Sequence, residues 1–174
     1  MNYPNEFIHY LSEFHGSRDY FECHEILEEY WKKHLPLDRE SIWVGFIQLA
    51  VGMYHYRRNN FSGALRTLQK ANQILSQYPK EVEHLGIDSK GLLSLLQNSI
   101  HKVQNTEPYT SPIMPIKDPE LIRACQAICN EYGYTWNCKS NLSDSLLVNR
   151  HSTRDRTEVI QERSNQLKKR SKDK

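Results

Sequence analysis

One stretch of the sequence is apolar around almost the whole circumference of a helix, and it limits the folds open to the chain. Apart from Gln48, His55 and Arg57, all of residues 42–57 are apolar, aromatic or glycine. A helix of this kind has to be covered on all sides. Its apolar run of about 15 residues is too short for a membrane span, which needs about 20. We therefore expect it to be the buried central helix of a bundle.

The sequence around this stretch divides into amphipathic helices with short connections. Asp19 and Glu22 form a capping pattern before one helix, and Asp118 followed by Pro119 opens another. Apolar residues recur at helical spacing, and no stretch alternates in the period of a strand. Short connections favour antiparallel neighbours. Helices are expected over residues 4–14, 19–34, 42–57, 61–77, 88–104 and 118–132. The prediction is an all-α fold, a compact antiparallel bundle of about five to six helices with a polar C-terminal tail.

Composition divides the chain into three parts. Residues 1–104 are expected to form the helical bundle, residues 105–139 a proline-containing arm plus a helix, and residues 140–174 a polar basic tail. Residues 150–174 hold nine Lys or Arg against four acids, and the remaining residues hold fourteen against seventeen. Net charge therefore gives no reason to expect nucleic-acid binding by the folded part. The tail is interpreted as a solvated end, with weak contact to RNA or an anionic surface as the alternative.

The first residues and the cysteines indicate a cytoplasmic protein without a membrane partner. Residues 1–6 lack both the basic start and the apolar core of a signal peptide. The cysteines show no disulfide framework, so reduced thiols are expected. Two of them stand four residues apart, whereas zinc sites usually begin with a tighter spacing. The four thiols are Cys23, Cys125, Cys129 and Cys138.

Two polar residues of the helix over 19–34 are directed toward its apolar face. On a helical wheel, His24 falls inside the apolar arc, close to Trp31, and Glu28 lies at the edge of that arc, whereas Glu25 falls on the polar side. His24 and Glu28 are four residues apart, so their side chains can meet. We expect this pair to be buried.

The central helix carries a matching stripe. Gly45, Gln48, Gly52 and His55 recur at spacings of three, four and three, and the two glycines let another backbone approach closely. If the helix over 19–34 packs there, Gln48 and His55 converge with the pair on that helix in a largely apolar place. A buried carboxylate in such a place must be paired, hydrogen-bonded or protonated.

Three interpretations of this cluster remain open. The cluster can satisfy its own hydrogen bonds and fix helix register, or it can be a functional site in an apolar pocket, with His24, Glu28, Gln48 and His55 as candidate catalytic residues. It can also hold a divalent metal through His24, Glu28 and His55, although the second His of the zinc-protease signature is replaced by Glu28. No other cofactor is expected.

The motifs of two helices resemble those of a bacterial family of uncharacterised proteins, domain of unknown function 309. The first motif covers residues 20–31 and contains the His24–Glu25 pair and Trp31. The second covers residues 45–64 and ends in Asn60-Phe61-Ser62-Gly63-Ala64. The resemblance covers about residues 8–75 and implies a compact helical bundle with no established activity. Its motif positions include the four cluster residues named above.

Three functional hypotheses follow. The first is a binding or scaffold module for an unknown protein partner, with a sealed, buried His/Glu/Gln cluster. The second is a metal-assisted or acid–base enzyme of hydrolase type, with Glu28 or His24 as general base and His55 in the same site. The third is an oligomeric structural protein that self-associates through exposed apolar residues. Solvent access to His24 and Glu28 distinguishes the first hypothesis from the second.

Overall fold

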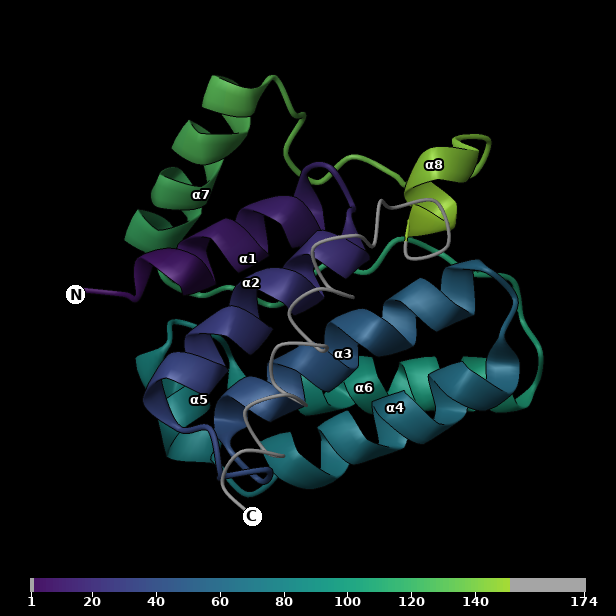
Figure 1. Ribbon diagram of the computed structural model, residues 1–174, viewed down its shortest axis with the longest axis horizontal. Coiled ribbons are helices and arrows are strands. Elements are labelled where there is room, and N and C mark those ends of the chain that lie inside the picture. The colour runs from purple at the N-terminus through teal and green to yellow at the C-terminus, as the bar shows by residue number, and fades with distance from the viewer. Residues whose placement is uncertain (1, 151–174) are drawn as a thin grey trace, which may run out of the picture.

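The computed structural model describes residues 2–150 and shows a bundle built from helices alone (Figure 1). No strand occurs among these residues, and the only β-type pairing described is an isolated bridge between Ile87 and Ile116. The all-α prediction is therefore confirmed, and the short helices α5 and α8 were not expected. The helices are α1 (Asn5–His15), α2 (Tyr20–His34), α3 (Ile42–Arg57), α4 (Phe61–Leu75), α5 (Pro79–His84), α6 (Ser89–Gln104), α7 (Pro119–Tyr132) and α8 (Ser145–Val148).

Helix α3 is the centre of the bundle, as its apolar circumference predicts. It packs against α2 on one side and α4 on the other, and α1 and α6 lie outside these two helices (Figure 1). Phe46, Leu49, Ala50 and Met53 of α3 are completely or almost completely buried. Helix α7 packs on α1, so the first and last long helices of the described chain lie side by side.

Side-chain caps explain where several helices begin. The carboxylate of Asp19 accepts a hydrogen bond from the Glu22 amide at the start of α2, and Asn60 accepts one from the Gly63 amide at the start of α4. These bonds satisfy amides that have no partner inside the helix. Helix α7 ends at Gly133, whose positive φ of 74° places it in the left-handed region that glycine tolerates.

The segment between α6 and α7 contains no helix and lies against α1, where the His15 side chain accepts a hydrogen bond from the Met114 amide. The divisions after residues 104 and 139 stay a prediction. The basic tail falls outside the described residues from position 151 onward. None of the described helices combines the length and apolarity that a membrane crossing requires.

Candidate functional site

The expected contact between His24 and Glu28 is present. Nε2 of His24 lies 3.0 Å from Oε2 of Glu28, and Nζ of Lys32 lies 2.9 Å from the other carboxylate oxygen. The expectation that the pair is buried is wrong, because the two side chains are 25% and 31% exposed. The pair therefore faces solvent across one edge, and the cluster is not sealed.

The helical wheel did not predict burial correctly, because it shows the direction in which a side chain points and not whether a neighbouring helix covers it. Among the residues of α2, only Tyr20, Cys23 and Leu27 are buried. Helix α2 packs on α1 and α3, and these neighbours cover a narrower arc than the apolar residues occupy. His24 and Trp31 lie on the uncovered part of the apolar arc and are half-buried.

The uncovered part of α2 borders a hollow of about 610 Å³. Helices α2 and α4 both pack on α3, and residues of all three helices, together with two from the loop after α2, line the space. The four residues selected from the sequence all take part. The hollow is lined by His24, Glu28, Trp31, Arg39, Glu40, Val44, Ile47, Gln48, Val51, His55, Arg66, Thr67 and Lys70.

The glycine stripe of α3 does bring another helix close, but that helix is α4 and not α2. A Cβ atom on Gly52 would lie 2.5 Å from Cδ2 of Leu68, and one on Gly45 would lie 2.8 Å from Cδ2 of Leu75. Helix α4 follows α3 after a short turn, so α4 is the helix that packs against the glycine stripe. Gln48 and His55 consequently face the space beside this contact, where they line the hollow.

The Glu28 carboxylate is held in its ionised form. The hydrogen bond from His24 lowers its pKa most, and the bond from Lys32 lowers it further, so that the pKa falls to about 2 although partial burial opposes the change. Nδ1 of His24 is shielded from solvent and has no hydrogen-bond partner among the described residues. Oε1 of Glu25 lies 3.6 Å from this nitrogen, so the His24 ring stands between two carboxylates.

The residues that could hold a metal differ by one from those expected. Potential ligand atoms of His24, Glu25 and Glu28 lie within 4.8 Å of one another, the one such group of three found in the described chain. His55 is not part of this group, and its Nδ1 lies 3.2 Å from the side-chain amide of Asn60. Glu25 joins because the His24 ring presents its second nitrogen toward the neighbouring residue.

Sequence reasoning missed the cations around the hollow. Arg39 comes from the loop after α2, and Arg66 and Lys70 come from α4. Lys70 is paired with Glu40 at 2.6 Å. Arg39 and Arg66 contact no carboxylate within residues 2–150. No motif indicated these residues, because they come together only when α4 and the loop pack near α2.

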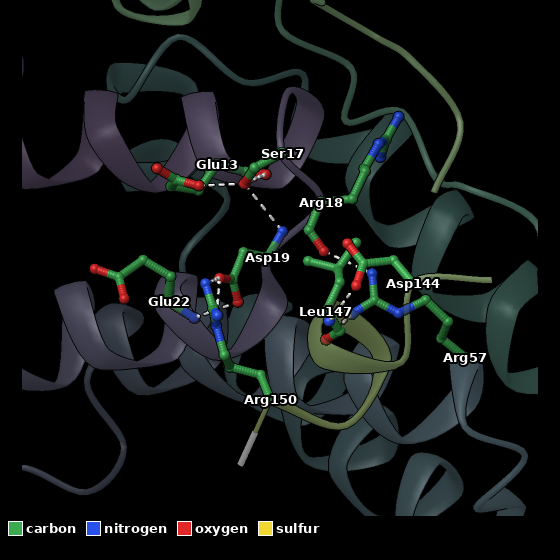
Figure 2. A network of polar contacts seen from close by, with 9 residues as sticks. All are labelled: Glu13, Ser17, Arg18, Asp19, Glu22, Arg57, Asp144, Leu147 and Arg150. Carbon is green, nitrogen blue, oxygen red and sulfur yellow. Dashed lines mark hydrogen bonds and ion pairs between the residues drawn. The ribbon is translucent and has the colours of Figure 1, made fainter. Parts of the chain in front are cut away.

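A second polar region, also missed, is sealed from solvent near the C-terminal end of α3. Arg57 donates to the backbone carbonyls of Arg18 (2.6 Å) and Leu147 (3.3 Å) (Figure 2). Its guanidinium also lies over the Tyr20 ring. Arg18 is almost completely buried and donates to the carbonyl of Cys138. The signal available in the sequence was a charged residue at the end of an otherwise apolar helix.

His15 belongs to the same sealed part of the molecule. Its Nε2 accepts from the Met114 amide at 3.0 Å, so the proton of the neutral ring is on Nδ1, which donates to the Leu11 carbonyl at 2.9 Å. Burial lowers the pKa of His15 to about 4, so the ring is neutral at physiological pH. It joins α1 to the segment before α7.

The cysteines are free thiols, as expected. Cys23, Cys125 and Cys129 are buried, and Cys138 is half-buried. Burial raises the pKa of the Cys125 thiol to about 12 and that of Cys129 to about 11. Protonated thiols of this kind are poor nucleophiles and poor metal ligands.

Comparison with known proteins shows that most residues of the hollow, all except Lys70, lie in a region shared with a family. A family model described as "Domain of unknown function (DUF309)" matches residues 7–67, which include His24, Glu28, Gln48 and His55. The "Uncharacterized protein YpuF" of Bacillus subtilis (strain 168) is 48% identical over 170 residues, covering 98% of each chain. No solved structure matches the chain.

Proposed function

The chain belongs to the DUF309 family, and from that premise we propose that it is a binding module for a small anionic ligand. The ligand would be held in the hollow between α2, α3 and α4. The observation that carries this proposal is the solvent access of the His24–Glu28 pair, which borders an open space of about 610 Å³. Ligand sites typically enclose about 300–1,000 Å³ and combine apolar walls with a few convergent polar groups.

The charges around the hollow favour an anion. Both of its carboxylates already have partners: Glu28 contacts His24 and Lys32, and Glu40 is paired with Lys70. The guanidinium groups of Arg39 and Arg66 have no such partner among the described residues. Guanidinium groups bind phosphate and carboxylate oxygens in pairs of hydrogen bonds, so these two arginines are the proposed anchors.

The floor and walls would orient the ligand. Val44 and Val51 of α3 and Trp31 of α2 supply apolar contact, and Gln48 supplies an amide that both donates and accepts. The His24–Glu28 pair lies on the α2 wall and can exchange a hydrogen bond with a bound group. This arrangement holds a small molecule with an acidic group and an apolar or ring-shaped part.

Calorimetric titration with sodium pyrophosphate tests the proposal. Arg66→Gln is expected to weaken binding about fivefold, because a charge-assisted hydrogen bond is lost. Arg123→Gln removes an exposed arginine on α7, outside the hollow, and is the matched control. No heat of binding at about 1 mM pyrophosphate, or equal effects of the two substitutions, would contradict an anion site here.

A second candidate function is a metal-assisted or acid–base enzyme, favoured by the clustering of His24, Glu25 and Glu28 ligand atoms. In a hydrolysis reaction, His24 or Glu28 would act as general base, with His55 in the same hollow. The test is Co²⁺ titration of chain purified without a histidine tag, followed by absorption. Glu25→Gln should weaken binding about tenfold relative to Glu29→Gln. No absorption band with about one equivalent of Co²⁺ would exclude the metal-assisted form of this candidate.

A further inference from the structure

The hollow between α2, α3 and α4 has an aromatic end, which the packing of α2 on α3 defines. Tyr30, near the end of α2, contacts Trp43 at the start of α3, with ring centroids 5.0 Å apart. Phe21, at the start of α2, contacts Tyr54 near the end of α3, at 6.2 Å. Helix α2 therefore runs antiparallel to α3, and Trp31 lies beside the start of α3.

The packing of α4 on α3 places a cation at the opposite end. Gly45 of α3 faces Leu75, the last residue of α4. Gly52 faces Leu68, near the middle of α4. The two helices therefore run antiparallel, and Arg66, in the first half of α4, lies beside the second half of α3. The hollow thus has an indole at one end and a guanidinium at the other.

The Trp31 indole is held in place without being stacked on another ring. Its Nε1 donates a hydrogen bond to the carbonyl oxygen of Asp38 at 2.9 Å, which fixes the ring relative to the loop after α2. Within residues 2–150 no other aromatic ring contacts it. The side chain is half-buried and lines the hollow. An aromatic ring of this kind is a stacking surface for a nucleobase.

Gln48 supplies a polar group between the two ends. The lining residues of α3 run from Val44 to His55, which is about 16 Å along a helix axis, and Gln48 stands between them. Its side chain is half-buried, and its amide makes no hydrogen bond within the described part of the chain. A glutamine amide presents a donor beside an acceptor, and one edge of adenine presents the complementary pair. The amide is therefore available to a ligand that carries such an edge.

We propose that the ligand of this hollow is a free purine nucleoside monophosphate, an inference that rests on the proposed anion site and names its ligand class. The purine stacks on Trp31 and pairs with the amide of Gln48. The phosphate is bound by Arg66 at the other end of the hollow. Arg39, on the loop that follows α2, packs its guanidinium on the base, as arginines do in nucleotide recognition.

Calorimetric titration of the full chain with adenosine monophosphate and with ribose 5-phosphate measures what the base contributes. Adenosine monophosphate is expected to bind about tenfold more tightly, because only it offers a ring to stack and an edge to pair. Gln48→Met keeps the side-chain volume but removes the amide, so it should weaken adenosine monophosphate about tenfold and leave ribose 5-phosphate unchanged. The matched control is Gln69→Met, which changes an exposed glutamine of α4 outside the hollow. Trp31→Leu is a second variant with the same expectation.

The outcomes separate this inference from the proposed function. Equal affinities for the two sugar phosphates, or equal effects of the Gln48 and Gln69 substitutions, would overturn the nucleotide while pyrophosphate binding still supported an anion site. Absence of binding by pyrophosphate and by both sugar phosphates would overturn both proposals. A 5′-phosphorylated tetra-adenylate should bind no more tightly than adenosine monophosphate. Binding of the tetra-adenylate about tenfold more tightly would show that the ligand is a nucleic acid, and would overturn a free nucleotide.

Discussion

The region around Arg57 and the hollow bordered by His24 use the same residue types in opposite surroundings. Arg57 and His15 are buried, and their hydrogen bonds go mainly to backbone groups that are fixed by the fold. His24 and Arg66 line a hollow that is open to solvent, where polar groups can exchange partners. The difference indicates that the first region holds the molecule together, whereas the second is the region where we propose that a ligand binds.

Replacing one arginine in each region is expected to give the largest contrast. Arg57→Met should lower the free energy of unfolding by about 3 kcal/mol, because buried carbonyls lose their donors and the contact with Tyr20 is lost. Arg66→Met, on the exposed face of α4, should change it by less than about 0.5 kcal/mol. Urea unfolding of both variants measures the contrast, and equal costs would remove the distinction between the regions.

Acid should weaken the sealed region through His15. Its pKa is about 4 in the folded chain, against an ordinary value of 6.5. As the pH falls, His15 therefore becomes protonated in the unfolded chain at a higher pH than in the folded chain. Stability is complete above about pH 6.5 and falls by about 3 kcal/mol as the pH decreases to 4.

Urea unfolding at several pH values measures this dependence. In a His15→Gln variant, this part of the pH dependence should disappear, although the variant is less stable overall. His84→Gln changes an exposed histidine and should keep the dependence of the unchanged chain. The assignment to His15 fails if the two variants show the same slope between pH 6.5 and 4.

The open region should respond least. Glu28→Ala is expected to cost about 1 kcal/mol, less than the ~3–5 kcal/mol of a broken buried pair, because solvent screens the contact. Glu25→Ala should cost less than about 0.5 kcal/mol. The Glu28 contribution is present above about pH 4.5 and is lost as the pH falls toward 2.

Thermal and urea unfolding at neutral pH compare the two glutamates. A cost above about 3 kcal/mol for Glu28→Ala would mean that the pair is a structural tie, like Arg57. That result would weaken the case for a ligand in the hollow, whereas a small cost combined with lost pyrophosphate binding would strengthen it.

The sequence by itself determined the six long helices, the central place of α3 and the contact between His24 and Glu28. These features follow from short-range geometry. Apolar periodicity and caps such as Asp19 act within a few residues, and side chains four apart in a helix are neighbours in any fold. The apolar circumference of residues 42–57 also determined that α3 is buried, because a helix that is apolar on all sides has no polar face to expose to water.

The tertiary structure alone decided which faces are covered and what meets in the hollow. The glycine stripe of α3 specified a close neighbour but not which helix, and α4 takes that place. His24 lies on an apolar arc, yet it is 25% exposed because α1 and α3 cover only part of that arc. Arg39 and Arg66 converge, and His15 becomes buried, only when distant helices pack. Helical periodicity fixes the direction of a side chain, whereas its exposure depends on residues far away in the sequence.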